Sequence, residues 1–279
     1  NLWRVDIRNP NTNNWTYAKL FTAKDASNNV QPITAAPQVT RHPKLNANTD
    51  SSTRLEEFTY MVLFGTGKYL GATDVSSTSR QTFYGIWDDM DAGSCVGVAF
   101  GVVTTACFNR ANLQAQVFCP GNPVDPTCQF AGTSGTVTST GSLTVDGKTF
   151  RITSATCMEY GALPADKQCG TDSVTGLPKD QQRGWYLDLK EAGERVPGDP
   201  LVVGSRVIFT SILPDPDPCK FGGTSWVNIL DAVTGKRLST SFLGVNNSTV
   251  PVTETSTGFA PSSAQIDSIA SAPTAMTAP

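Results

Sequence analysis

The chain has 279 residues, of which 39% are hydrophobic and 16% are charged, and its formal net charge is −3. This length and apolar content permit a sizeable core and exclude a disordered linker. No Lys/Arg-rich run provides the basic surface that nucleic acid requires, and the longest weakly polar run, residues 96–106, is too short for a transmembrane helix. The 24 Gly and 18 Pro are typical of many short strands joined by turns. We therefore expect an all-β protein that is soluble or at most peripheral to a membrane.

The first 89 residues carry five predicted strands. Residues 2–7 and 15–21 form a hairpin around an Asn- and Pro-rich turn. A weaker strand at 36–39 precedes a strongly apolar strand at 58–64, which ends at a Gly-Thr-Gly turn. The next strand covers 82–88.

Residues 90–182 form a Cys-, Gly- and Thr-rich region that we interpret as an insertion between blade strands. Six of the seven cysteines lie between Cys95 and Cys169, which favours a disulfide-stapled β subdomain and an oxidising, secreted location. Within the insertion, the Asp-Gly pair in residues 142–152 predicts a hairpin.

Regular strands return at 184–189, 199–210 and 225–231. Residues 1–6, 82–88 and 225–231 share one pattern, an aromatic residue within a short apolar strand that ends at aspartate. Such a small recurring unit must stack on copies of itself, and four short strands in about fifty residues match one β-propeller blade. About two blades and a leading strand pair are present, so the predicted fold is an incomplete propeller ring, and we expect further N-terminal sequence to complete it.

The predicted organisation has four parts: propeller blade strands at 1–89, the insertion at 90–182, a propeller blade at 183–246 and a Ser/Thr/Pro-rich C-terminal tail at 247–279. Because the tail is poor in core-forming residues, we expect it to be mobile unless a partner orders it.

Several short motifs, in a fixed order, resemble the C-terminal β-propeller of the PilC family of type IV pilus biogenesis factors and tip adhesins. They lie within residues 1–88 and 183–245, at 1–6, 64–70, 81–88, 184–189, 193–196, 199–202, 206–210, 217–219, 222–226 and 230–235. The resemblance implies a quinoprotein-like propeller from a large secreted protein, whose propeller half supports pilus assembly. The insertion and the tail depart from the family pattern.

The resemblance also suggests calcium as a ligand to consider, because some family members bind calcium in an EF-hand-like loop. The nearest candidate here contains Asp89, Asp91 and Gly93, but Phe100 stands where the closing glutamate ligand is needed. A polar turn is the preferred interpretation. We assign no metal ligand and no other cofactor in this chain, and calcium stays an expectation from the family alone.

The polar residues indicate no catalytic site. His42 is the only histidine, and the sequence contains no Gly-x-Ser-x-Gly turn, so we expect His42 in an exposed loop and assign no catalytic residue. The cysteines form no Cys-x-x-Cys pair, and their odd number leaves one without a partner inside the chain. If the six in the insertion pair with one another, Cys219 is the odd one.

The tryptophans at 3, 87, 185 and 226 are predicted to pack inside the blades, with a quinone-stacking floor as the alternative. We expect a non-enzymatic pilus assembly and tip adhesion factor at the bacterial surface. Its expected partners are minor pilins or pilus tip proteins, together with a host or abiotic surface, and its most probable contact surface is the insertion, since loops on rigid scaffolds carry binding. The alternatives are a secreted propeller enzyme, of the quinoprotein dehydrogenase or glycosidase kind, and a purely structural envelope domain.

Overall fold

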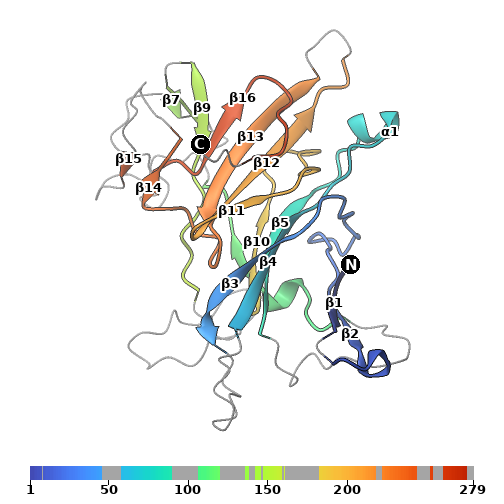
Figure 1. The fold of residues 1–279 in the computed structure, drawn as a ribbon. Coiled ribbons are helices and arrows are strands. Elements are labelled where there is room, and N and C mark those ends of the chain that lie inside the picture. The colour runs from blue at the N-terminus through green and yellow to red at the C-terminus, as the bar shows by residue number, and fades with distance from the viewer. Residues whose placement is uncertain are drawn as a thin grey trace, which may run out of the picture.

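The protein is described by a computed structural model that covers residues 1–7, 9–45, 58–89, 106–119, 136–137, 142–145, 147–158, 160, 182–217, 222–243, 252–253 and 260–274. The regular secondary structure of the described chain is almost entirely β-strand, and its main sheets form three layers, a hairpin and two larger sheets (Figure 1). The all-β propeller prediction is therefore confirmed, and the sheets do not close into a ring within the described residues.

The first layer is the predicted N-terminal hairpin. Strand β1 (Leu2–Asp6) pairs antiparallel with β2 (Thr16–Phe21), and the short 3-10 helix η1 (Thr12–Asn14) lies in the turn. One side of the hairpin is apolar and packs on the next sheet, through Leu2, Ala18, Leu20 and Phe21.

The second layer is a five-stranded sheet in the order β3-β4-β5-β10-β6. Its strands are β3 (Gln38–Leu45), β4 (Phe58–Gly65), β5 (Thr82–Asp88), β10 (Gly184–Asp188) and β6 (Gln114–Gln116). Every residue of β5 is buried, because the hairpin covers one face of the sheet and the third layer covers the other. This double coverage explains why β5 does not alternate between apolar and polar residues from Phe83 to Trp87.

The third layer is a seven-stranded sheet in the order β11-β12-β13-β16-β9-β8-β7. Its long central pair is β12 (Arg206–Pro214) with β13 (Gly223–Asp231), and β11 (Leu201–Val203) lies at one edge. The remaining strands are β16 (Ser263–Ile266), β9 (Lys148–Arg151), β8 (Ser142–Val145) and β7 (Thr136–Val137).

Four short elements complete the described chain: helix α1 (Ala72–Val75), the 3-10 helix η2 (Arg110–Asn112), and the strand pair β14 (Thr240–Ser241) with β15 (Val252–Thr253). Among the residues that the structure describes, no helix is long and apolar enough to span a membrane.

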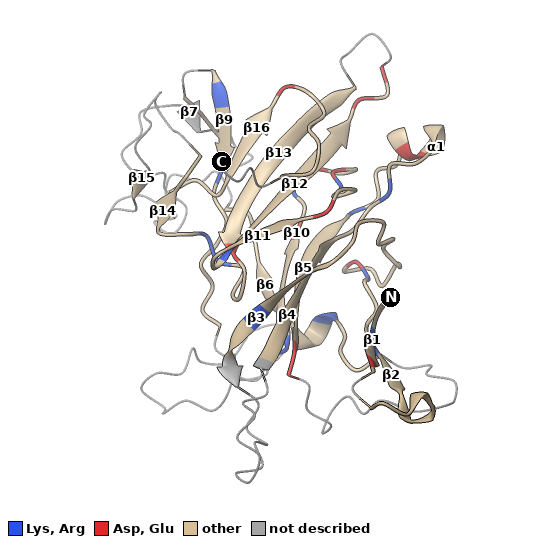
Figure 2. Ribbon diagram, viewed as in Figure 1, with Lys and Arg blue, Asp and Glu red and all other residues tan. Residues whose placement is uncertain are grey.

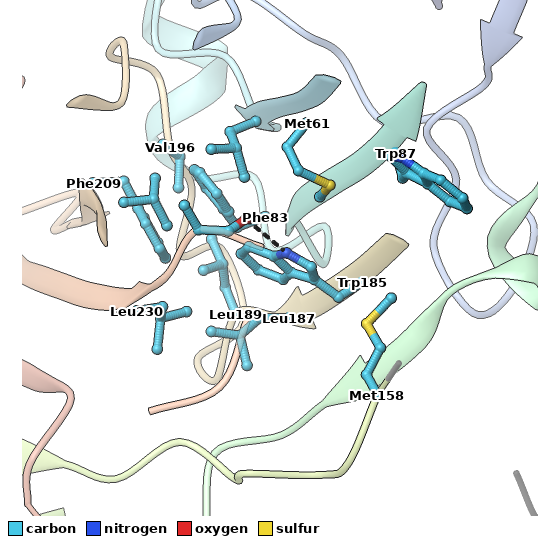
Figure 3. Packing of buried hydrophobic residues seen from close by; sticks show 13 residues of the cluster. Met61, Phe83, Trp87, Met158, Trp185, Leu187, Leu189, Val196, Phe209 and Leu230 are labelled. Carbon is cyan, nitrogen blue, oxygen red and sulfur yellow. Dashed lines mark hydrogen bonds between the residues drawn. The ribbon is translucent and has the colours of Figure 1, made fainter. Parts of the chain in front are cut away.

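Trp185 lies at the centre of the core between the two large sheets (Figure 3). Its ring packs with Phe83, and its indole Nε1 donates a hydrogen bond of 3.2 Å to the carbonyl of Ala232. Two glycines make room for it: a Cβ atom would lie 2.4 Å from the ring at Gly85 and 2.3 Å from it at Gly235. Phe83 also stacks on Phe209 with ring centroids 3.8 Å apart, which joins the second layer to the third.

The insertion and the tail differ from our expectation where the structure describes them. The hairpin predicted at 142–152 is present as β8 and β9, but it extends the seven-stranded sheet, while β6 pairs parallel with β10 in the five-stranded sheet. The described insertion strands thus join both layers instead of forming a sheet of their own.

The expectation of a mobile tail is wrong for residues 260–274, because β16 lies between β13 and β9. Ser263, the first residue of β16, and the preceding Ser262 are buried with hydrogen-bond partners, since Ser263 Oγ donates to Asn228 Oδ1 over 2.6 Å and Ser262 Oγ is 2.8 Å from Thr153 Oγ1. A polar, low-complexity segment can therefore form an interior strand here, because its small side chains fit and each hydroxyl is satisfied.

Candidate functional site

The connection between β4 and β5 presents exposed apolar side chains on a firmly held loop. Leu70 is 81% exposed and Tyr69 is 37% exposed. The loop runs from Thr66 to Gln81 and includes helix α1, which projects from the body of the molecule (Figure 1). We refer to residues 66–81 as the α1 loop.

Arg195 fastens the α1 loop to the body of the protein. Its side chain is buried, and its guanidinium donates hydrogen bonds to the carbonyls of Lys68 (3.1 Å), Ser77 (2.8 Å) and Asp74. Its Nε donates to Gly193 O over 2.8 Å. Burial lowers the pKa of Arg195, an effect opposed by the nearby charge of Asp74. The planar guanidinium thus holds three points of the loop with one side chain, a geometry that lysine cannot reproduce.

Asp74 closes the loop from within. Its Oδ2 accepts hydrogen bonds from the main-chain N–H groups of Leu70 (3.0 Å) and Gly71 (3.1 Å), and its Oδ1 is 3.0 Å from Lys68 Nζ. The hydrogen bond from Leu70 N–H, followed by that from Lys68, lowers the pKa of Asp74 below its usual 3.8. These contacts fix the main chain directly at Leu70, the residue that carries the most exposed apolar side chain of the loop.

The base of the loop is equally constrained. Thr66 is buried, and its Oγ1 accepts a hydrogen bond of 2.8 Å from Thr82 N. Gly67 has a φ of +109°, and a Cβ atom there would lie 2.4 Å from Arg195 Cβ. Glycine is therefore required both by the backbone conformation and by the close approach of Arg195. The Gly-Thr-Gly segment is the strand-ending turn that the sequence predicts.

A surface hollow of about 740 Å³ lies beside the hairpin, and Lys19, Lys24 and Arg110 contribute to its wall. Arg110 is already engaged, because its guanidinium forms an ion pair with Asp188 and lies 3.7 Å from the centre of the Tyr186 ring. Figure 2 shows Lys and Arg interspersed with Asp and Glu over the described ribbon, without a continuous basic stripe there. We assign no ligand to this hollow.

Three of the four tryptophans pack as predicted. Trp87, Trp185 and Trp226 are buried, and the Trp226 ring lies 3.5 Å from the Arg151 guanidinium. The prediction is wrong for Trp3, which is 44% exposed on the outer side of β1, where it faces Tyr17. The faces of Trp185 and Trp226 are occupied by protein groups, as expected for blade packing.

His42 is not in an exposed loop, as we expected, but buried on β3. Its ring meets Tyr160 edge to face at 4.2 Å and lies 5.1 Å from the Trp87 ring. The neighbouring polar residues and Pro43 suggested a loop, whereas tertiary contact with two aromatic rings places the histidine inside. In the described part of the chain, His42 thus stands in an aromatic cluster with Trp87 and Tyr160.

The cysteines depart from the arrangement in which Cys219 is the odd one. Cys107 and Cys157 are disulfide-bonded, whereas Cys119 is a buried thiol. Since Cys119 belongs to the insertion, its six cysteines do not all pair with one another. Cys219 lies outside the described residues.

Of the loop that we considered as a calcium site, the structure describes only the first residue. Asp89 is buried and forms an ion pair with Arg183, while Asp91, Gly93 and Phe100 lie outside the described residues. Over the described part of the chain, no group of three or more His, Cys, Asp or Glu side chains could hold a metal ion. Calcium therefore remains a proposal from the family.

Comparison with known proteins identifies the relatives of this fold. A family model described as the PilY1 beta-propeller domain matches residues 14–125. The type IV pilus biogenesis factor PilY1 of Pseudomonas aeruginosa PAO1 is 32% identical over 226 residues, which is 79% of this chain. The crystal structure of the P. aeruginosa PilY1 C-terminal domain superposes with a TM-score of 0.55 over 88% of this chain, at 28% identity.

The chain belongs to the PilY1 family. The resemblance seen in the sequence is thus confirmed, and it places the chain in the propeller region. A PilY1 homolog from Xylella fastidiosa is also related, with 26% identity over 253 residues. The chain spans 15% of the length of the PAO1 relative and 42% of the solved PilY1 C-terminal domain.

Sequence reasoning missed the role of Arg195. The residue stands in one of the family motifs, residues 193–196, but its partners are the main-chain carbonyls of a loop more than a hundred residues earlier. Every residue has the same main-chain carbonyl, so the sequence does not show which carbonyls will accept hydrogen bonds from an arginine. The only signal in the sequence was the pair of glycines at 65 and 67, which indicates that another segment packs closely on the main chain there but does not identify that segment.

Proposed function

We propose that this PilY1-type propeller serves as a non-enzymatic assembly factor for type IV pili that also acts in adhesion at the pilus tip. Its partners would be minor pilins or other pilus tip proteins, and a host or abiotic surface for adhesion. The observation that carries the proposal is membership of a family whose relatives are named type IV pilus biogenesis factors. The proposed location is outside the cell, at the pilus or the outer envelope, in keeping with the cysteine content.

The α1 loop is the described surface that best suits contact with a protein partner. A leucine that is 81% exposed on a loop held by Arg195 and Asp74 loses little conformational freedom on binding. Apolar side chains of this kind fill pockets on a partner and can dominate the binding energy. The insertion at 90–182 remains a proposed contact surface, as expected from the sequence, and most of it lies outside the described residues.

The test is a piliation assay in a bacterium that carries the full-length protein. Leu70→Asp should reduce sheared surface pilin about tenfold or more, as expected when a central apolar contact is replaced by a charge. Val30→Asp is the matched control, because Val30 is 69% exposed on a different loop, and it should leave piliation unchanged. Wild-type piliation in the Leu70→Asp strain, at equal protein abundance, would remove the α1 loop from the proposal.

Deletion of residues 95–169 removes the insertion together with β6, β7, β8 and β9, so only an unchanged phenotype bears on the insertion as a contact surface. Unchanged piliation and adhesion after this deletion would rule out the insertion as a contact surface. An absorbance spectrum of the purified protein distinguishes the enzyme alternative, since a bound quinone absorbs in the near ultraviolet and visible range.

A further inference from the structure

Lys190, which lies just after strand β10, carries a buried amino group without a hydrogen-bond acceptor. Its Nζ atom is shielded from solvent, and no described residue accepts a hydrogen bond from it. The main chain is held in place there, because Arg80 donates hydrogen bonds to the carbonyls of Leu189 (3.2 Å) and Lys190 (3.0 Å). A buried ammonium without an acceptor is costly, so this position has a physical reason to hold the neutral amine.

Arg151 provides a second reason for a neutral amine at Lys190. Burial, followed by the positive charge of Arg151, lowers the pKa of Lys190, an effect opposed by the charges of Glu191, Glu194 and Cys119. The two glutamates are themselves engaged by Arg151, whose guanidinium lies 3.3 Å from Glu191 Oε1 and 3.0 Å from Glu194 Oε2. A neutral amine has a free electron pair and is a nucleophile, whereas the ammonium form is not.

Cys119 brings a thiol to the same region from the insertion. The thiol is buried, and the residue is 3% exposed. The Cys119 N–H donates a hydrogen bond of 2.8 Å to the carbonyl of Ile152, the residue after Arg151. The ring of the preceding Phe118 lies 5.2 Å from the Arg151 guanidinium, and Phe118 lines a cavity of about 240 Å³ together with Lys190. Cys119 and Lys190 therefore approach the same arginine from two segments that are distant in the chain.

We propose that oxidation joins Cys119 and Lys190 by a covalent bond between the cysteine sulfur and the lysine nitrogen. Hydrogen peroxide first transfers one oxygen atom to the thiol, which becomes a sulfenic acid, and the rest of the peroxide leaves as water. The Lys190 amine then attacks the sulfur, the S–O bond breaks, and the hydroxyl leaves as water with one proton of the amine. The product is a neutral sulfenamide, which has two hydrogen atoms fewer than the separate side chains.

The surroundings suit this reaction at both steps. The cavity lined by Phe118 and Lys190 has room for a molecule as small as hydrogen peroxide. The positive charge of Arg151 favours the thiolate, which is the form of cysteine that peroxide oxidises. The bond also removes a buried amine that has no acceptor, and it attaches the chain after β6 to the chain after β10. Since β6 pairs with β10 over only three residues, Gln114–Gln116, a covalent bond would strengthen a short attachment.

The test is peptide mapping by mass spectrometry of the full-length protein after treatment with hydrogen peroxide. We expect a linked pair of peptides, one with Cys119 and one with Lys190, whose combined mass is two hydrogen atoms below that of the separate peptides. Fragmentation of the pair should locate the bond at these two residues. Dithiothreitol should separate the pair, because a thiol reduces the sulfur–nitrogen bond. This result does not depend on the pilus partners proposed above.

Lys190→Met removes the nucleophile and should leave Cys119 as a sulfenic acid after oxidation. Labelling of Cys119 by dimedone, which reacts with sulfenic acids, should be about tenfold or more higher in this variant than in the wild type. Lys148→Met is the matched control, because Lys148 is exposed, and it should label like the wild type.

Equal dimedone labelling of Cys119 in the wild type and in Lys190→Met would overturn the proposal. Recovery of oxidised Cys119 in a disulfide with another cysteine would overturn it as well. Should Lys190→Met fail to fold, the wild type alone decides, because absence of the linked peptides from the oxidised protein would rule out the bond.

Discussion

At the residue scale, the clearest feature is a buried charge pair within the third layer. Arg151 is 1% exposed and donates two hydrogen bonds of 3.0 Å to the carboxylate of Glu194, which is fully buried. Ser211 Oγ and the main-chain N–H of Glu191 donate to the same carboxylate. The guanidinium also lies over the rings of Trp226 and Phe118. Burial lowers the pKa of Arg151, and the charge of Glu194 opposes this effect. Both terminal nitrogens of the guanidinium have acidic partners, Glu194 and Glu191, which offsets part of the cost of burying charge, whereas Arg151 Nε has no hydrogen-bond partner among the described residues.

Replacing one partner of the Arg151–Glu194 pair should reveal the free-energy cost of burying the other partner's charge. We expect Arg151→Met to lower the free energy of unfolding by about 3–5 kcal/mol, because it leaves the Glu194 carboxylate buried without its counter-charge. Lys148→Met on the same strand is the control and should change stability by less than about 0.5 kcal/mol, since Lys148 is exposed. Urea unfolding followed by tryptophan fluorescence measures both. The double variant Arg151→Met/Glu194→Met should recover much of the loss, and a double variant no more stable than Arg151→Met would contradict this account.

At the element scale, the seven-stranded sheet is assembled from distant segments. Strand β16 comes from the C-terminal tail and bridges β13 to the insertion strands β9 and β8. Ala264 of β16 pairs with Val227 on one side and Phe150 on the other. The tail thus supplies the link between the blade and the insertion hairpin, a role that its composition does not suggest.

Interrupting this link should weaken the sheet. Ala264→Pro should destabilise the protein by at least about 1–3 kcal/mol, because proline cannot donate to the ladder and a buried carbonyl loses its partner. Ser271→Pro introduces the same residue into exposed chain after the strand and should have little effect. Hydrogen exchange should show faster exchange in β9 and β13 for Ala264→Pro alone. Unchanged exchange in both strands would mean that β16 contributes nothing to the sheet.

At the scale of the whole molecule, the two large sheets share one core. The cluster around Trp185 draws residues from the five-stranded sheet, such as Phe83 and Leu187, and from the seven-stranded sheet, such as Phe209 and Leu230 (Figure 3). The hairpin has a separate apolar cluster against the other face of the five-stranded sheet. The five-stranded sheet is thus the layer through which the other two are coupled.

This shared core predicts cooperative unfolding of the two sheets. Phe209→Ala should cost about 3–5 kcal/mol, because it removes a fully buried ring stacked on Phe83 and leaves a cavity. Phe242→Ala is the matched control, since Phe242 is 48% exposed, and it should cost much less. Thermal unfolding followed by far-ultraviolet circular dichroism and by tryptophan fluorescence should give coincident transitions for both variants. Transitions that separate in Phe209→Ala would instead indicate sheets that unfold as independent units.

The sequence by itself determined the class of fold, most of the blade strands and the family. The strands at 2–7, 58–64 and 82–88 were predictable because apolar runs bounded by turn residues depend on local chemistry alone. The family motifs followed from the order of short segments, which needs no contact between them.

Only the tertiary structure decided which of these segments meet. The burial of His42 depends on Tyr160, the anchoring of the α1 loop depends on Arg195, and the interior position of β16 depends on Asn228 and Thr153. In each case a polar residue is buried because its hydrogen bonds or ring contacts are completed by a segment far away in the chain. Local pattern records a residue's polarity but not its partner, so a polar residue satisfied at long range has the same local signature as one exposed to water.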